Sequence, residues 1–176
     1  TVYNTTVAEL KAAKDALEAA IALKNIPVKL TTDVNSPVLY KIWINRGDNK
    51  RLQYDAASAM VAVADEYVGN KAQAWFFMSG ADATKDVLIL PYTGAGKVLA
   101  TNSFSEGDSK VEVVESTADG YSNNWNIVAI ADSEWSNITI LNGSDATYYF
   151  SNYGGVDKKM GFYNTTPSTD GGSMFQ

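Results

Sequence analysis

The sequence predicts a mainly-β domain: a closed barrel built from three repeats of four short strands, with one amphipathic α-helix in front of it. Three large aromatic residues indicate the repeat, because Trp75, Trp125 and Phe175 lie fifty positions apart and each closes a stretch that begins with an apolar strand. Propeller blades also have four strands, but three blades are too few to close a ring. Three such units therefore favour a closed barrel with a hairpin cap.

Residues 7–25 are predicted to form the helix, since Ala, Leu, Lys and Glu are dense there. Apolar residues recur in it at intervals of three, seven and four positions: Val7, Leu10, Leu17 and Ile21. Thr6 with Glu9 gives a capping box, and Pro27 ends the helix. The narrow stripe can cover one neighbour, so two roles stay open: the tail of a preceding helical module, or a helix packed along the barrel. Residues 27–37 read as a polar linker.

Each predicted repeat carries two further apolar anchors and one more strand. The anchors lie ten positions apart: Ile42 and Leu52, Ile89 and Leu99, and Ile140 and Phe150. A further strand-like run follows them at residues 60–64, 110–115 and 159–163. We therefore expect a helix and linker over residues 1–36, and repeats at about 37–85, 86–135 and 136–176.

Composition narrows the chemistry. The chain of 176 residues is 45% hydrophobic, which suits one folded domain, and its net charge of −6 comes without a Lys or Arg cluster. Nucleic acid and membrane insertion are therefore not expected. The chain has no Cys and no His, so disulfides, thiol or imidazole metal ligation and His-activated nucleophiles are excluded. No cofactor and no metal are predicted.

One tripeptide connects the repeat to a known family. Gln73-Ala74-Trp75 resembles the Gln-any-Trp signature that ricin-B-like β-trefoil lectins carry once per repeat. The other two units hold related tripeptides at the same phase: Asn123-Asn124-Trp125 and Ser173-Met174-Phe175. The resemblance implies a β-trefoil over residues 37–176 and a non-catalytic carbohydrate-binding accessory module. The alternative is a structural spacer or protein-interaction module with degenerate sugar pockets.

The resemblance also implies where a sugar would lie. In these lectins an Asp after the second strand, a stacking aromatic on the third strand and polar groups near the motif Gln hold the ligand. The first position falls on Asp55, Asn102 and Tyr153, the second on Val63, Val113 and Tyr163. Tyr67 and Tyr153 stand in Gly-rich and Asn-rich loops, where exposed aromatics favour contact with a ligand. The candidate ligand-binding residues are Asp55, Tyr67, Asn70, Gln73, Asn102, Asn123, Tyr153 and Tyr163.

Structural roles compete with these binding roles. Asp55 also suits a turn-capping residue and Tyr163 a half-buried strand residue. The repeated aromatics are expected in the barrel core rather than on its surface. Carboxylates are available for glycoside hydrolysis, but they lack an apolar setting that would raise the pKa of one of them, so no catalytic activity is expected. The chain begins at Thr1 without a signal sequence. It is expected to be a piece of a larger bacterial protein, secreted or at the cell surface, with neighbouring domains and glycan as partners.

Overall fold

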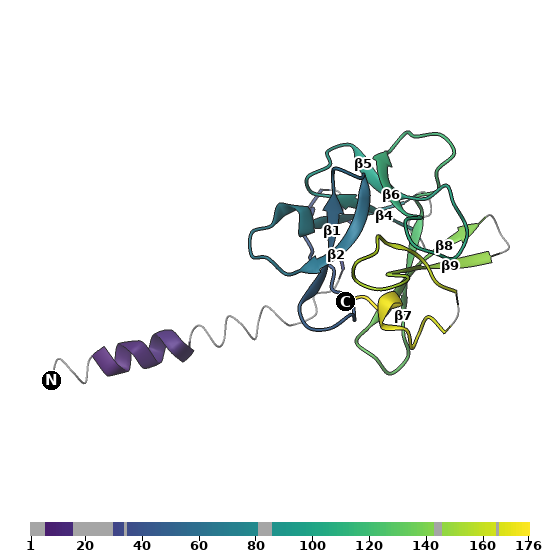
Figure 1. Ribbon diagram of the computed structural model, residues 1–176. Helices are drawn as coiled ribbons and strands as arrows, with labels where there is room; N and C mark the ends of the chain where they lie inside the picture. Colours follow the sequence, from purple (N-terminus) through teal and green to yellow (C-terminus); the bar gives the residue numbers. More distant parts are fainter. Residues whose placement is uncertain (1–5, 16–29, 34, 81–85, 143–145, 165) are drawn as a thin grey trace.

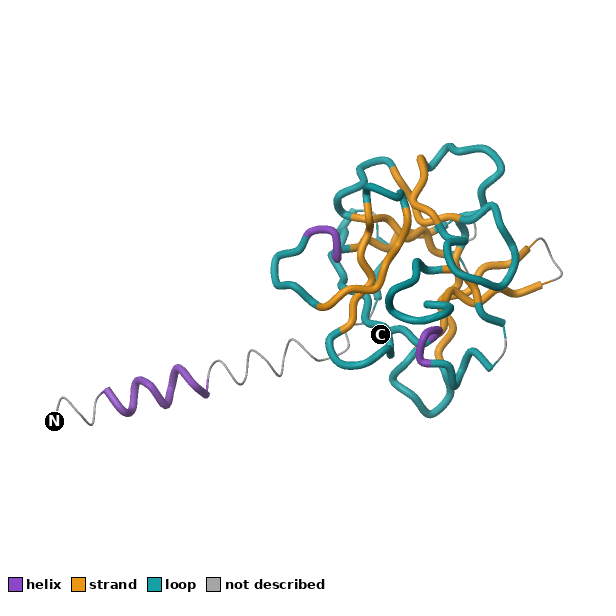
Figure 2. The backbone as a smooth tube through the Cα atoms, viewed as in Figure 1, coloured by secondary structure: helices purple, strands orange, loops and turns teal. Residues whose placement is uncertain are grey.

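The protein is seen in a computed structural model that describes residues 6–15, 30–33, 35–80, 86–142, 146–164 and 166–176 (Figure 1). Its strands are β1 Lys50–Asp55, β2 Met60–Asp65, β3 Trp75–Ser79, β4 Val87–Pro91, β5 Lys97–Ala100, β6 Glu112–Glu115, β7 Trp125–Ala129, β8 Ser136–Asn142, β9 Ala146–Ser151 and β10 Gly161–Phe162. Two 3-10 turns, η1 Lys71–Gln73 and η2 Gly171–Ser173, precede the aromatic that closes the first and third units. The mainly-β architecture is confirmed, and loops make up much of the chain between the strands (Figure 2).

Six strand segments close into a ring. Strands β3, β4, β7 and β8 pair in that order, each antiparallel to the next. The segment around residues 40–44 joins β3 through the pair Tyr40 and Trp75, and the chain end joins β8 through Ser136 and Phe175. Ile44 pairs with Phe175 and completes the circle. The predicted closed barrel is therefore present, and closure leaves no free edge at these strands.

Three hairpins cap one end of the barrel: β1 with β2, β5 with β6, and β9 with β10. They meet one another through single pairs, Met60 with Glu112 and Ala62 with Lys159. Gly107 and Phe162 form a third pair, in which a side chain at Gly161 would collide with the Gly107 carbonyl oxygen. The close approach of these backbones explains glycine at position 161.

The repeated aromatics fill the core, as the sequence predicts. Trp75, Trp125 and Phe175 are buried, and the first two donate their indole N–H groups to equivalent carbonyls. Trp75 Nε1 lies 3.1 Å from Leu52 O, and Trp125 Nε1 lies 2.9 Å from Leu99 O. Phe175 has no such donor, and its ring instead stacks on Phe150 at 5.4 Å between centroids. In each unit the closing aromatic thus contacts the second apolar anchor: through a hydrogen bond in the first two units, and through ring stacking in the third.

One anchor of the third unit lies two residues from its predicted place. Ile42 and Ile89 stand two positions after the residues that pair with Trp75 and Trp125. In the third unit the residue two positions after Ser136, the partner of Phe175, is Ile138 and not Ile140. Both are buried, because side chains two apart share one face of a strand. Twelve positions therefore separate Ile138 from Phe150, whereas ten separate Ile42 from Leu52 and Ile89 from Leu99.

The segment predicted as a polar linker is partly docked. Leu30 packs against the hydrophobic core cluster, the Thr31 N–H donates to Tyr40 Oη at 2.8 Å, and Ser79 Oγ donates to Thr32 Oγ1 at 3.1 Å. One apolar contact and two hydrogen bonds thus hold residues 30–32 against the barrel. The proposed boundary at residue 36 stays a prediction.

The described part of the predicted helix, residues 6–15, is helical. All ten residues are exposed, including Val7 and Leu10, and Lys11 Nζ pairs with Asp15 Oδ2 at 2.7 Å one turn later. Residues 16–25 of the prediction lie outside the described residues, so both roles considered for the helix stay predictions. Among the described residues, no helix combines the length and apolarity needed to cross a bilayer.

Candidate functional site

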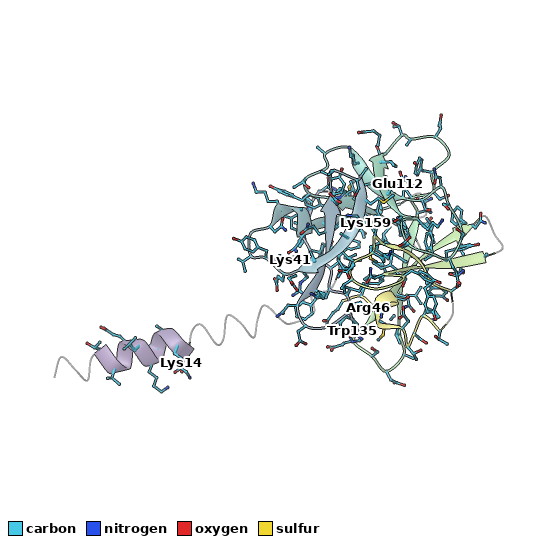
Figure 3. The ribbon with its side chains drawn as sticks, viewed as in Figure 1. Lys14, Lys41, Arg46, Glu112, Trp135 and Lys159 are labelled. Atoms are coloured by element: carbon cyan, nitrogen blue, oxygen red, sulfur yellow. The ribbon has the colours of Figure 1, made fainter. Side chains whose placement is uncertain are left out.

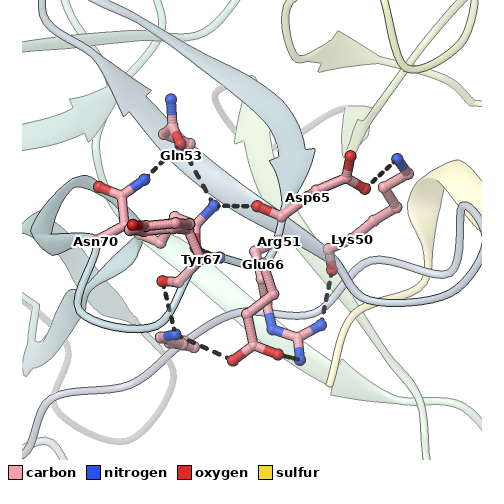
Figure 4. Close-up of polar contacts among 9 residues, drawn as sticks. Lys50, Arg51, Gln53, Asp65, Glu66, Tyr67 and Asn70 are labelled. Carbon is pink, nitrogen blue, oxygen red and sulfur yellow. Dashed lines mark hydrogen bonds and ion pairs between the residues drawn. The ribbon is translucent and has the colours of Figure 1, made fainter.

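The connection from β2 to β3 in the first unit is built around Gln73. Figure 4 shows polar contacts of this connection, with Asp65, Tyr67 and Asn70 labelled. The Gln73 amide is fully buried, and Nε2 donates to Asp65 O at 2.7 Å and to Gln53 Oε1 at 3.3 Å. Oε1 accepts the Tyr67 N–H at 3.1 Å. The side chain predicted to bind a ligand therefore holds the loop in shape, and its polar atoms face the protein.

Asn70 and Tyr67, two neighbours in this loop, differ in role: the first stabilises the loop and the second is exposed. Asn70 caps η1, since its Oδ1 accepts the Ala72 N–H at 3.0 Å while Nδ2 donates to Gln53 Oε1 at 2.9 Å. Among the described residues, Tyr67 makes its hydrogen bonds through its backbone, and the residue is 72% exposed. Of the predicted residues in this loop, only Tyr67 presents its side chain to solvent.

A buried ion pair beneath the same loop was not predicted from the sequence. Arg51 Nη2 lies 2.8 Å from Glu66 Oε2, with side chains 1% and 9% exposed, and the guanidinium lies 3.6 Å from the centre of the Trp43 ring. Lys41 Nζ approaches the other Glu66 oxygen at 3.0 Å. Burial lowers the pKa of Arg51, while Glu66 opposes the shift. This cluster anchors the loop that carries Tyr67.

Asp55 stands at the end of β1 as predicted, but its carboxylate is occupied. It accepts the Ala57 N–H at 3.1 Å and the Ser58 hydroxyl at 2.7 Å, and it pairs with Lys159 from the third unit, which is labelled in Figure 3. The turn-capping role therefore accounts for part of its contacts. The stacking position of this unit, Val63, is buried. At the two positions that the resemblance implies, the first unit thus offers neither an unpaired carboxylate nor an aromatic ring.

The pH dependence of Asp55 follows from these partners. Hydrogen bonds from Lys159 and Ser58 lower the pKa of the Asp55 carboxyl from 3.8 to about 2. The folded protein therefore binds the Asp55 proton more weakly than the unfolded chain does. The ionised carboxylate contributes fully to the stability of the fold above the pKa of the unfolded chain, and this contribution is lost as the pH falls from 3.8 towards 2. Carbon-detected NMR titration of Asp55 should give this midpoint, and Lys159→Met should raise it. A midpoint near 3.8 in the parent chain would show that the pair does not form in solution.

In the second unit the neighbours of the predicted residues pair, Thr101 with Ser122, but no hydrogen bond joins Asn102 to Asn123 within the described part of the chain. Asn102 is exposed on the turn after β5, and Val113, at the stacking position, is 1% exposed. Asn123 lines a groove together with Ile140 and Leu141 of β8, and Asn102 is not among its lining residues. This unit lacks an aromatic platform at the position that the resemblance implies.

The third unit brings two predicted residues into contact. The rings of Tyr153 and Tyr163 lie 5.7 Å apart and are inclined at 56°, and we refer to them as the tyrosine pair. Tyr163 is half-buried, whereas Tyr153 is exposed and faces solvent. The chain therefore places aromatic side chains at both the carboxylate and the stacking positions of this unit.

The backbone around the tyrosine pair is well anchored. Tyr163 N–H donates to Tyr149 O at 3.1 Å, and the turn after Tyr153 uses Gly154 and Gly155, both at positive φ. Asn152 next to Tyr153 is fully buried; its Nδ2 donates to Lys158 O at 3.2 Å and its Oδ1 has no partner among the described residues. A buried acceptor of this kind requires a water or ligand donor.

The opposite side of the third unit is held by Asp170. Its carboxylate accepts hydrogen bonds from Arg46 at 3.1 Å, from Ser173 at 3.0 Å and from Ser151 at 3.4 Å. Arg46, labelled in Figure 3, also donates to Asn152 O at 3.2 Å. The loop before Phe175 is thereby tied to the segment that carries Tyr153. Within the described part of the chain, no group of three or more Asp or Glu residues is arranged to hold a metal ion.

Comparison with known proteins identifies the fold. No family model matches the sequence, and no curated protein matches it. Among solved structures, the chain is similar to a mosquitocidal holotoxin, with 14% identity and a TM-score of 0.60 over 82% of this chain and 17% of the other. It is equally similar to the Polyporus squamosus lectin, solved with the human-type influenza-binding epitope Neu5Aca2-6Galb1-4GlcNAc, with 14% identity and a TM-score of 0.60 over 82% of this chain and 49% of the lectin.

A third similar structure is the binding domain of botulinum neurotoxin serotype G, with 11% identity and a TM-score of 0.57 over 84% of this chain and 45% of that domain. The chain spans less than half the length of each of these three structures. At these identities the similarity establishes a shared fold, and the predicted β-trefoil is confirmed.

Proposed function

We propose that the chain is a non-catalytic carbohydrate-binding module and that the tyrosine pair is its sugar site. The observation that carries this proposal is the contact between Tyr153 and Tyr163 at 5.7 Å, in the one unit whose stacking position keeps an aromatic. The fold supports it, because a structure of the same fold is a lectin solved with a glycan epitope.

The geometry suits a sugar ring. Aromatic faces pack against the apolar C–H face of a pyranose, and two rings inclined at 56° form a corner that can contact a face and an edge at once. Phenolic hydroxyls both donate and accept hydrogen bonds, as sugar hydroxyls require. The site carries no carboxylate at the Tyr153 position, so we expect a dissociation constant on the order of 1 mM for a single sugar.

Removing one ring tests the site. Tyr163→Ala should weaken glycan binding at least about tenfold, or about 1.4 kcal/mol, because the stacking surface and its buried area are lost together. A glycan array would identify a ligand, and isothermal titration calorimetry would compare the parent with Tyr153→Ala and Tyr163→Ala. Tyr92→Ala is a matched control, since Tyr92 is also exposed and lies in a different unit. Equal losses from all three substitutions would argue against a specific site.

A spacer or protein-interaction module is the second candidate, and the first unit favours it. Asp55 is paired with Lys159, and the buried Gln73 amide makes its hydrogen bonds within the loop. Two side chains that were predicted to contact a sugar therefore contact the protein itself. If a broad glycan array gives no signal while circular dichroism shows an intact β fold, the lectin proposal fails and this second role stands.

We further propose that the module belongs to a larger extracellular bacterial protein and holds it near glycan. Support comes from the similar structures, of which this chain matches less than half and, in the holotoxin, 17%. Antibody labelling of intact cells that express the full-length protein tests the location; labelling only after permeabilisation would contradict it.

A further inference from the structure

A polar groove of about 360 Å³ lies beside strands β7 and β8, and neither residue of the tyrosine pair lines it. We call it the asparagine groove, after the side chains that dominate its lining: Asp86, Tyr121, Asn123, Asn124, Asn126 and Leu141. Its volume is at the lower end of the range that small-ligand pockets occupy, which corresponds to one or two sugar rings.

Strand geometry explains why the amides face outward. Trp125 points into the core, and alternation along β7 therefore sends Asn124 and Asn126 to the outer face. Val87 pairs with Trp125 in an antiparallel register, so Asp86, one residue earlier, lies opposite Asn126 at the edge of the groove. Asn126 lies in β7, while Asp86 and Asn124 directly precede β4 and β7, so all three short polar side chains stand on or next to barrel strands.

These polar groups are available to a ligand. The side chains of Asp86, Asn123, Asn124 and Asn126 are half-buried, and none makes a hydrogen bond to another residue in the part of the chain that is described. Half-buried amides and carboxylates retain their need for hydrogen bonds, which solvent or a ligand must meet. Amide N–H groups, amide oxygens and a carboxylate together match the donor and acceptor pairs of vicinal hydroxyls.

The walls of the groove are preorganised. The Tyr121 hydroxyl donates to Glu112 Oε2 at 3.1 Å, which fixes the ring and raises the pKa of Tyr121. Leu141 is 48% exposed and gives the groove an apolar edge. A methyl group at Gly80 would lie 2.8 Å from Asp86 Cβ and 3.2 Å from Asn124 Oδ1, so glycine there leaves both groups in place.

We propose that the asparagine groove is a second ligand site, and that it binds a neutral polyhydroxylated ligand such as a hexose or the end of an oligosaccharide. The described lining residues include one carboxylate and no Lys or Arg, which disfavours acidic sugars and phosphorylated ligands. A single carboxylate also provides too few charged ligands for tight binding of Ca²⁺, which takes six to eight oxygen ligands. The site is independent of the tyrosine pair, so each can fail without the other.

NMR of the whole chain tests the groove directly. Neutral methyl glycosides, added to roughly 50 mM so that weak binding is saturated, should shift the backbone amides of Asp86, Asn123, Asn124, Asn126 and Leu141. The amides of Tyr153 and Tyr163 report on the tyrosine pair in the same spectrum. Parallel titrations with sialyllactose and with CaCl₂ serve as the acidic-sugar and cation arms, and neither should shift the groove amides as strongly.

Two variants make the assignment specific. Asp86→Asn should weaken the neutral glycoside at the groove at least about tenfold, because a charged acceptor forms the stronger hydrogen bond. Asp119→Asn is its matched control, since it changes the same charge at an exposed loop position outside the groove and should leave binding unchanged. Asn126→Ala provides a second loss, with the indole N–H resonance of Trp125 as a check that the barrel is intact.

Three results would overturn the proposal. The first is the absence of shifts at the groove amides with every neutral glycoside. The second is a shift with CaCl₂ or sialyllactose that exceeds the one with neutral sugars. The third is affinity that survives both Asp86→Asn and Asn126→Ala. Shifts at the tyrosine pair alone would support the proposed function and reject the asparagine groove.

Discussion

Trp125→Ala is expected to lower the free energy of unfolding by about 3–5 kcal/mol, the range for truncating a large aromatic in a packed core. The Trp125 indole is completely buried and donates to Leu99 O at 2.9 Å. Its ring lies 5.5 Å from Phe150 and 6.4 Å from Phe162, so the deletion leaves a void where two units meet. Neighbours on rigid barrel strands can collapse into that void only in part.

Trp125→Phe separates the hydrogen bond from the volume. It keeps most of the ring but leaves Leu99 O without its buried donor, so we expect a smaller loss of about 1–3 kcal/mol. Urea unfolding followed by circular dichroism measures both variants. Trp135→Phe is the control, because Trp135 is only half-buried and should change stability by less than about 0.5 kcal/mol. A loss below about 1 kcal/mol for Trp125→Ala would contradict the packing described here.

The barrel could be predicted from the sequence because its physical demands repeat. Each unit must supply one large side chain to the shared core, and so aromatics recur at positions 75, 125 and 175. The two-residue shift to Ile138 could not be predicted, since Ile138 and Ile140 have the same chemistry and lie on the same strand face. Only the pairing of Ser136 with Phe175 fixes which of them is equivalent to Ile42.

The contacts that the candidate site residues make could not be predicted from local sequence patterns. The motif located the loop of Gln73, but a buried loop must satisfy its own backbone groups, and the amide serves that purpose. Asp55 is paired with Lys159, which is 104 positions away, a contact that no local pattern indicates. The contact between Tyr153 and Tyr163 could be predicted, because the resemblance places both residues at ligand-contact positions of the same unit. The asparagine groove was missed apart from Asn123, since its lining comes from segments of two units.

Glu66→Ala is expected to cost about 3–5 kcal/mol of stability, because it leaves Arg51 charged and unpaired in the interior. The Arg51 side chain is 1% exposed, and Glu66 accepts its hydrogen bond at 2.8 Å and a second from Lys41 at 3.0 Å. The guanidinium cannot lose its proton at neutral pH to escape this cost. Packing against Trp43 at 3.6 Å offsets only part of it, since a cation above an aromatic ring contributes about 1–2 kcal/mol.

Two comparisons decide whether burial is the cause. Asp65→Ala breaks the neighbouring pair with Lys50, in which Asp65 is 81% exposed, and should cost less than about 1 kcal/mol. The double variant Arg51→Met with Glu66→Leu removes both charges and should recover most of the loss, because no unpaired ion then remains inside. Urea unfolding measures all of them. If Glu66→Ala costs no more than Asp65→Ala, water reaches the guanidinium and the loop that carries Tyr67 rests on weaker contacts than its geometry indicates.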